Sequence, residues 1–195
     1  MPTVFVDVDT QLDFLFPAGA LYVSGAEHIV PAIANLNRYA AEHGIPVLST
    51  TDAHSENDPE FASWPPHCIV GTLGQRKPAA TLLEKRSVIP NHDAPVQLEG
   101  AQQIILEKQT IDAFATRSLP RVIDALQADR FVVYGVVTEI CVLCAARGLL
   151  ARGKQVVVVS DAIQSLDRTK ADEAIKEIRG LGGTVSSLSS ECLHG

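Results

Sequence analysis

The chain has 195 residues, of which 46% are hydrophobic, and its formal net charge is −7 at pH 7. The length and apolar content predict a single domain with a substantial core, and the acidic balance without a basic cluster argues against nucleic-acid binding. No apolar segment approaches the roughly 20 residues that a membrane-spanning helix requires, which argues against a membrane protein.

The first predicted strand, residues 3–9, is apolar except at its start and at two carboxylates, Asp7 and Asp9. These carboxylates interrupt the unbroken apolar region that a signal peptide needs. The four cysteines are also too few for a disulfide-stabilised secreted domain of this length. We therefore expect a cytoplasmic protein.

Apolar runs alternate with helical patterns along the whole chain. Strands are predicted at residues 3–9, 46–51, 103–107, 130–136, 155–160 and 183–187, and helices at 26–43, 78–86, 118–128, 139–152 and 167–181. Because the strands are continuously apolar and do not alternate, the sheet should be parallel and buried on both faces. The prediction is one α/β domain over residues 1–195, a three-layer α/β/α fold with a six-stranded, mainly parallel sheet.

Polar residues stand at the carboxyl ends of four predicted strands. They are Asp9 after the first strand, Asp52 and His54 after the second, Lys108 after the third and Cys141 after the fourth. The carboxyl ends of parallel strands meet at one edge of a sheet, and ligands bind in the crevice outside them. The sequence therefore predicts that a thiol, an ammonium group, an imidazole and two carboxylates converge on one site.

Cys141 lies in the first turn of a predicted helix, where unpaired N–H groups and the helix dipole favour a thiolate. A nucleophilic cysteine needs a base or a cation beside it, and Asp9 and Lys108 are candidates for these roles. A buried structural thiol, a solvated Asp9 and an exposed Lys108 remain alternatives. The pair Cys141 and Cys144 also matches the C-x-x-C redox motif, but in thioredoxin-like proteins that motif follows an early strand.

The predicted loop at residues 52–77 is long and irregular, and loops of that length in a compact domain are usually functional. Its polar residues include Asp52, His54, Glu60 and His67. Two imidazoles with one or two carboxylates suit a divalent transition metal such as zinc or iron, and do not suit calcium. Cys68 is a competing ligand, and solvated loop side chains are the alternative to a metal site.

Five sequence motifs occur in the order that one known family shows. They are Asp9-Thr-Gln11-Leu-Asp13-Phe14, Thr51-Asp52-Ala-His54, Trp64-Pro-Pro-His67-Cys68-Ile-Val-Gly-Thr72, Lys108 and Gly135-Val-Val-Thr-Glu-Ile-Cys141-Val. Together they resemble the isochorismatase-like cysteine hydrolase superfamily, and within it the nicotinamidase (pyrazinamidase) branch. The motifs cover essentially the whole chain.

The resemblance implies roles for individual positions. Cys141 would be the nucleophile, Asp9 the carboxylate that transfers protons and Lys108 the third catalytic residue. A cis peptide bond is implied between Val136 and Val137, and the N–H groups of Val137 and Cys141 would then form an oxyanion hole.

The resemblance also implies a metal and a ring-binding site. One divalent metal ion, Zn²⁺ or alternatively Fe²⁺ or Mn²⁺, would be held by Asp52, His54, Glu60 and His67. The third of these positions is His in some members of the family and Glu in others. Phe14 and Trp64 match positions that sandwich a flat pyridine ring.

The function that the resemblance implies is hydrolysis of nicotinamide to nicotinate and ammonia through a cysteine thioester, with a place in NAD salvage. The segment after Lys108 departs from the family pattern, because it is shorter than the usual segment that places an aromatic residue over the substrate. Asp112-Ala-Phe114 is a candidate match to that segment.

This departure from the family pattern leaves a second hypothesis open, a related amidohydrolase for another small amide or carbamoyl compound. A non-catalytic binding protein on the same fold is a third reading. The expected partner is a small amide, with no nucleic acid or membrane, and a homo-oligomer is compatible with the sequence.

Overall fold

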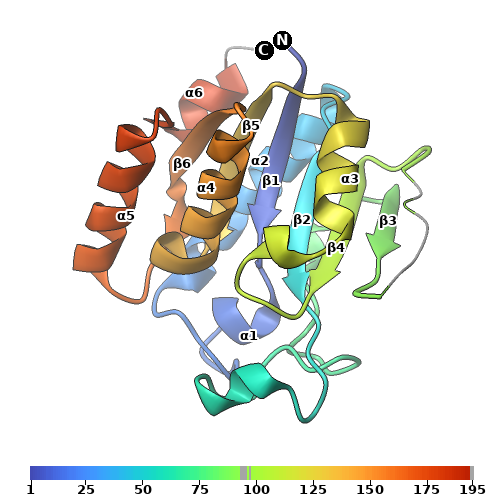
Figure 1. The fold of residues 1–195 in the computed structure, drawn as a ribbon, viewed down its shortest axis with the longest axis vertical. Helices are drawn as coiled ribbons and strands as arrows, with labels where there is room; N and C mark the ends of the chain where they lie inside the picture. Colours follow the sequence, from blue (N-terminus) through green and yellow to red (C-terminus); the bar gives the residue numbers. More distant parts are fainter. Residues whose placement is uncertain (93–95, 97, 194–195) are drawn as a thin grey trace.

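The computed structural model describes residues 1–92, 96 and 98–193. Its strands form one parallel sheet in the order β3-β4-β2-β1-β5-β6-β7 (Figure 1). The strands are β1 (Thr3–Val8), β2 (Val47–Asp52), β3 (Arg86–Ile89), β4 (Gln103–Lys108), β5 (Arg130–Val136), β6 (Gln155–Gln164) and β7 (Thr184–Ser186). The α-helices are α1 (Leu12–Leu15), α2 (Val30–Glu42), α3 (Ser118–Leu126), α4 (Leu143–Ala151), α5 (Arg168–Gly180) and α6 (Leu188–Leu193).

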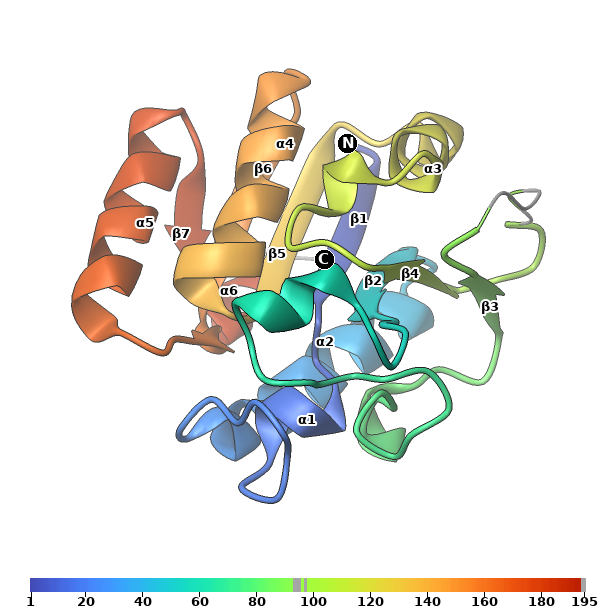
Figure 2. The same cartoon turned by 60° about the horizontal axis from the view of Figure 1, so that its bottom comes forward.

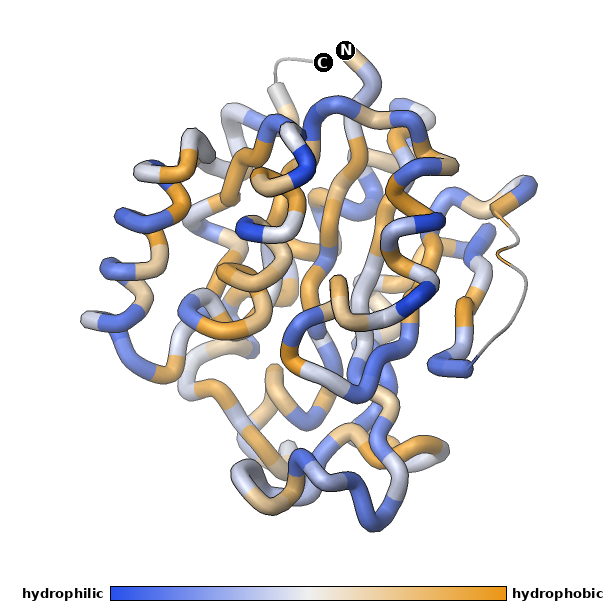
Figure 3. Tube along the Cα trace, in the orientation of Figure 1, coloured by the Kyte–Doolittle hydropathy of each residue, from blue (hydrophilic) through white to orange (hydrophobic). Residues whose placement is uncertain are grey.

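Helices cover both faces of the sheet, as the continuously apolar strands predict. α3, α4 and α5 lie on one face, and α2 and α6 lie on the other (Figure 1). Each face of the sheet has its own hydrophobic core, and alternate β1 side chains pack into one or the other. Val4 and Val6 lie on the α3–α5 side, and Phe5 lies on the α2 side. Figure 3 shows mostly hydrophobic residues along the central strands and hydrophilic residues on the outer side of α5. Among the described residues, the helices are too short or too polar to cross a membrane.

The α/β fold with a parallel sheet is confirmed, but the sheet has seven strands where the sequence predicts six. The additional strand is β3, which begins at Arg86, the last residue of the helix that the sequence predicts at residues 78–86. Only a short 3₁₀ turn, η3 (Ala79–Thr81), forms there before the chain extends into β3. The side chain of Gln103 accepts a hydrogen bond from the Leu83 N–H at 2.8 Å, and β3 pairs with β4. These tertiary bonds outweigh the local helix propensity.

The other boundaries differ in smaller ways. β6 continues to Gln164, beyond the predicted end at residue 160, and the predicted helix at 26–43 starts with a 3₁₀ turn, η1 (Ala26–Ile29), before α2. The predicted helix at 139–152 starts with one π-helical turn, η5 (Thr138–Val142), before α4. Cys141 therefore lies in this wider turn, directly after β5. Figure 2 shows the carboxyl ends of the strands from below, with the segment after β2 crossing in front of them.

Candidate active site

The site lies at the carboxyl ends of β4, β2, β1 and β5, which are neighbours in the sheet. β1 ends where Asp9 adopts a left-handed backbone with φ of 49°. Beside it, Gly135 of β5 has φ of 118°, and a Cβ there would lie 2.1 Å from the Val8 carbonyl oxygen. Only glycine allows β5 to approach β1 so closely. This close approach brings the turn that carries Cys141 next to the turn that carries Asp9.

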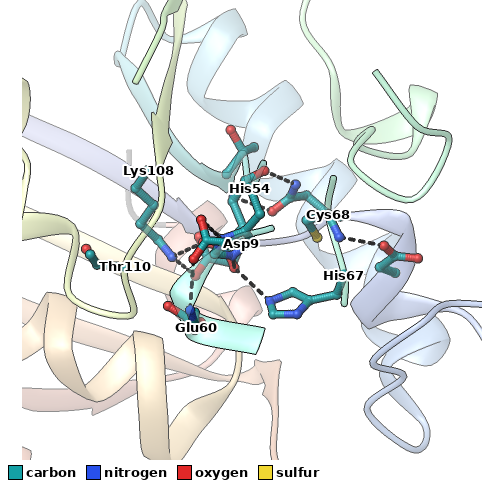
Figure 4. A network of polar contacts seen from close by, with 12 residues as sticks. Asp9, His54, Glu60, His67, Cys68, Lys108 and Thr110 are labelled. Carbon is teal, nitrogen blue, oxygen red and sulfur yellow. Dashed lines mark hydrogen bonds and ion pairs between the residues drawn. The ribbon is translucent and has the colours of Figure 1, made fainter. Parts of the chain in front are cut away.

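The ammonium group of Lys108 lies between two buried carboxylates. Its Nζ is 2.9 Å from Oδ2 of Asp9 and also contacts Oδ1 of Asp52 (Figure 4). Thr50 donates a hydrogen bond from its hydroxyl to Oδ1 of Asp9 at 2.6 Å. All four residues are buried. The structure thus brings Asp9 and Lys108 together as predicted, and it adds Asp52 as a second partner of the lysine.

Burial and neighbouring charges shift the pKa values of Lys108, Asp9 and Cys141. Burial alone would lower the pKa of Lys108, but Asp52 and Asp9 outweigh it and raise the pKa well above 10.5. Burial raises the pKa of Asp9 above 3.8, against the opposing effect of Lys108. Burial, and then Asp9, raise the pKa of Cys141 well above 9.0, and Lys108 offsets this only in part. Burial and the Asp9 carboxylate thus oppose the thiolate that the helix terminus and Lys108 favour at Cys141.

Asp52, His54 and His67 form a compact group whose atoms could hold a metal ion, called the metal-binding group below. Their ligand atoms lie within 4.8 Å of one another, and Oδ2 of Asp52 is 3.7 Å from Nε2 of His67 and 3.9 Å from Nε2 of His54. The buried Nε2 of His54 has no hydrogen-bond partner. The other ring nitrogen of His67 lies 2.7 Å from the Pro65 carbonyl oxygen, so Nδ1 carries the proton and Nε2 is left to bind a metal. One carboxylate and two imidazoles fit zinc, iron or manganese.

The remaining loop residues have different positions. Glu60 does not belong to this compact group, but it lines the same pocket, and burial followed by the nearby Asp52 raises its pKa. Cys68 also lies outside the group. Its Sγ is 3.9 Å from the Gly74 carbonyl oxygen, its N–H donates to Asp13 at 2.7 Å, and burial raises the pKa of its thiol. The geometry therefore favours Glu60 over Cys68 as a fourth ligand.

A narrow, mostly apolar pocket joins the thiol to the metal-binding group. Its free volume is about 30 Å³, so a substrate must displace side chains at the rim on entry. The expected ring-binding residues, Phe14 and Trp64, both line it, as does Val137, which follows a cis peptide bond from Val136. The lining residues are Phe14, Leu21, Val23, Asp52, Glu60, Trp64, His67, Ile111, Val137, Ile140, Cys141 and Leu166.

The pocket wall after Lys108 is aliphatic. Ile111 lines the pocket, whereas Phe114 packs on α4, where a Cβ at Gly148 would lie 2.1 Å from its ring. The guanidinium of Arg152 also lies 5.3 Å from the centre of the Phe114 ring. Phe114 therefore supports α4, and Ile111 provides the wall that the sequence leaves uncertain.

The four cysteines are free thiols. Cys144 lies on α4, three residues after Cys141. It is half-buried, and burial raises the pKa of its thiol as well. The pocket includes Cys141 without Cys144. These observations favour the nucleophile hypothesis over the redox one.

Two residues of the opening motif have positioning roles that the sequence does not reveal. The side chain of Gln11 accepts from the N–H of Asp52 at 2.6 Å and donates to its carbonyl oxygen at 2.8 Å, so it fixes the end of β2. The carboxylate of Asp13 accepts from the N–H groups of Ala20 and Cys68, so it ties the loop that carries His67 to the turn after β1. The only sign of these positioning roles in the sequence is that both residues belong to the motif, and a motif does not show which atoms a side chain contacts.

Known proteins share this arrangement of elements. The isochorismatase domain family matches residues 3–190. The structure is similar to that of a nicotinamidase from Bacillus subtilis, with a TM-score of 0.83 and 26% identity, over 96% of this chain and 100% of that one. It is also similar to a pyrazinamidase from Pyrococcus horikoshii crystallised in complex with zinc, with a TM-score of 0.80 and 26% identity, over 96% of this chain and 99% of that one.

A third similar structure broadens the range of substrates among these proteins. It is an N-carbamoylsarcosine amidase from Thermoplasma acidophilum, with a TM-score of 0.77 and 25% identity, over 96% of this chain and 97% of that one. The family match extends over nearly the whole chain and includes every element of the site described above. The chain therefore belongs to the isochorismatase family.

Proposed function

We propose that the protein is an amidohydrolase that converts nicotinamide and water to nicotinate and ammonia. One observation carries the proposal: a single narrow pocket is lined both by the Cys141 thiol and by Asp52 and His67 of the metal-binding group. A nucleophile and a site for a ring nitrogen within one apolar pocket match an aromatic amide. The similarity to a nicotinamidase and to a zinc-containing pyrazinamidase supports the same reaction.

Proton transfer within the Asp9–Cys141 pair starts the reaction. The thiol of Cys141 lies against the Asp9 carboxyl, whose raised pKa makes it a better base than an ordinary aspartate. Asp9 takes the thiol proton as sulfur attacks the carboxamide carbon, and the N–H groups of Val137 and Cys141 stabilise the oxyanion. The proton then passes from Asp9 to the leaving nitrogen, which releases ammonia and leaves a thioester.

Water completes the cycle. Asp9, again ionised, takes a proton from water as the hydroxyl attacks the thioester carbon. The carbon–sulfur bond then breaks, the proton on Asp9 returns to the Cys141 sulfur, and the nicotinic acid that leaves ionises to nicotinate. Lys108, 2.9 Å from Asp9, keeps a positive charge next to the carboxylate and the sulfur in each step. A divalent metal held by Asp52, His54 and His67, with Glu60 as a fourth ligand, supplies a Lewis-acidic site for the ring nitrogen when bound. Phe14 and Trp64 hold the ring.

Ammonia release from nicotinamide by the purified, zinc-loaded protein tests the proposal. We expect turnover by the unchanged protein and none by Cys141→Ala, with the folded state of the variant checked by circular dichroism. Absence of ammonia release from the unchanged, zinc-loaded protein would contradict the proposal. Turnover by Cys141→Ala would contradict the assignment of the nucleophile.

One observation favours a second candidate, hydrolysis of a different small amide or carbamoyl compound. The wall at Ile111 is aliphatic and offers no ring for stacking, and an N-carbamoylsarcosine amidase is among the similar structures. A panel of aromatic amides, aliphatic amides and carbamoyl compounds separates the candidates by kcat/KM. If none is hydrolysed but some bind, the non-catalytic reading replaces both.

A further inference from the structure

We propose that Asp58 is a positioning residue that orients His54 for metal binding and connects the metal-binding group to the turn that leads to Trp64. Asp58 follows His54 by four residues and is buried, although it lies in a loop. Its two carboxylate oxygens have separate partners. Oδ2 lies 3.1 Å from Nδ1 of His54, and Oδ1 accepts the Glu60 N–H at 2.9 Å.

The first contact determines which nitrogen of His54 faces the metal site. The 3.1 Å contact is an ion-pair contact, and an ionised carboxylate can only accept, so it favours the tautomer with the proton on Nδ1 of His54 and the lone pair on Nε2. Nε2 points toward Asp52 and has no hydrogen-bond partner of its own. A metal ligand must present such an unprotonated nitrogen, and the partner of the other nitrogen fixes the ring. For His67 a backbone carbonyl has this role. For His54 it is the side chain of Asp58, which mutation can remove.

The second contact connects this histidine to the pocket wall. Asp58 is the N-cap of the 3₁₀ turn η2 (Pro59–Ala62), which carries Glu60. The Glu60 carbonyl oxygen accepts the Trp64 N–H at 3.1 Å, so the turn leads directly to Trp64 in the pocket. A metal that fixes His54 thus also fixes, through Asp58, the position of Trp64. Trp64 is the only tryptophan of the chain, so tryptophan fluorescence reports on this residue alone.

The inference rests on the metal site proposed above, and zinc affinity tests both without using activity. Asp58→Ser keeps an N-cap oxygen for the turn, but its side chain is too short to reach His54. Asp112→Ser is the matched control, because Asp112 caps the turn η4 (Ala113–Ala115) with the same bond, 2.9 Å to the Phe114 N–H. In a chelator competition we expect zinc affinity to fall roughly 10–100-fold in Asp58→Ser and to stay unchanged in Asp112→Ser.

Trp64 emission gives the second measurement. Zinc added to the metal-free protein should shift the emission and reduce quenching by acrylamide, and the response at saturating zinc should be smaller in Asp58→Ser. An equal response in the two proteins overturns the connection to Trp64. If Asp58→Ser does not fold, Asp58→Asn replaces it, since its single carbonyl oxygen can serve only one of the two N–H groups.

The possible results separate the two proposals. If the unchanged protein does not bind zinc, the metal site and the role of Asp58 both fail. If it binds zinc and Asp58→Ser binds it equally well, only the role of Asp58 fails. If Asp58→Ser unfolds more easily in the presence of chelator but keeps its zinc affinity, Asp58 is only a helix cap, and the inference is overturned.

Discussion

Two buried ion pairs involve aspartates at the end of β1, Asp7 and Asp9. They differ in how many of their carboxylate oxygens have hydrogen-bond partners. Asp7 pairs with Lys77 at 2.9 Å and also accepts hydrogen bonds from Thr10, Asn37 and Ser49. Asp9 pairs with Lys108 two residues later and lies against the thiol. The first group is closed by protein donors, whereas the second adjoins a pocket and the unsatisfied His54 Nε2.

The Asp7 group is a closed network of buried polar side chains. The Asp7 group extends through Asn37 to the hydroxyl of Tyr134 and the Thr81 carbonyl oxygen, on the α2 side of the sheet. Its members bind one another, so no position is left for a ligand, and its contribution is structural. The Asp9 group has the same kinds of residues, but it contacts Asp52 and Cys141, which line a pocket, and Oδ2 of Asp9 has no hydrogen-bond partner besides its ion pair with Lys108. The two aspartate groups are alike in burial and charge, and they differ in whether every carboxylate oxygen has a hydrogen-bond partner.

The largest expected difference follows from substituting each aspartate by its isosteric amide. Asp9→Asn should fold and lose roughly 10²–10⁴-fold in kcat, because the amide cannot take the thiol proton. Asp7→Asn should keep the kcat of its folded fraction but lose about 1–3 kcal/mol of unfolding free energy, because its amide group faces donors. Nicotinamide hydrolysis and urea unfolding measure the two effects. Equal losses of kcat would erase the distinction between the groups.

Removing the structural cation should cost stability alone. Lys77→Met leaves the Asp7 carboxylate buried without its ion pair, which should lower the free energy of unfolding by about 3–5 kcal/mol. Lys77 also contacts the Thr10 hydroxyl, in the turn after Asp9. The kcat of the folded variant, measured well below its melting temperature, should nevertheless match that of the unchanged protein. A kcat loss as large as that of Asp9→Asn would make Lys77 part of the catalytic machinery.

Thiol alkylation provides a more selective comparison. Because burial and Asp9 raise the pKa of Cys141 well above 9.0, its reaction with iodoacetamide should be slow at neutral pH and rise with pH. In Asp9→Asn the carboxylate is gone and Lys108 remains, so the pKa should fall and alkylation at pH 7 should accelerate, although turnover is lost. Asp7→Asn should alkylate at the unchanged rate. Slower alkylation of Asp9→Asn would show that Asp9 holds Cys141 as a thiolate.

The sequence predicts the convergence of the strand ends, because it depends on a general property of parallel sheets. Asp9, Asp52 and Lys108 meet there as expected. It does not predict the Asp7 group, since Lys77 lies 70 residues along the chain and its position depends on the packed fold. It also misplaces residues 78–86, where bonds to Gln103 and β4 override the helix propensity. A sequence also does not show how strongly burial and Asp9 oppose a thiolate at Cys141, because both effects depend on the packed fold.

The smallest expected effects come from removing one hydroxyl from each group. Tyr134→Phe removes the donor to Asn37 and should lower the unfolding free energy by about 1 kcal/mol, with turnover unchanged at every pH. Thr50→Val removes the donor to Asp9, a bond that lowers the carboxyl pKa, so the pKa of Asp9 should rise further above 3.8.

The sign of the pH effect in Thr50→Val follows from the role of Asp9 as base. The carboxyl must be ionised to accept the thiol proton, so activity is lost as the pH falls through its pKa. A higher pKa in Thr50→Val therefore moves the acidic limb of the kcat/KM profile to higher pH, while the limb stays in place in Tyr134→Phe. Profiles of the two variants beside the unchanged protein measure the shift. An acidic limb that does not move in Thr50→Val would mean that a group other than Asp9 controls it, and the Asp9 group would then differ from the Asp7 group only in its position beside the pocket.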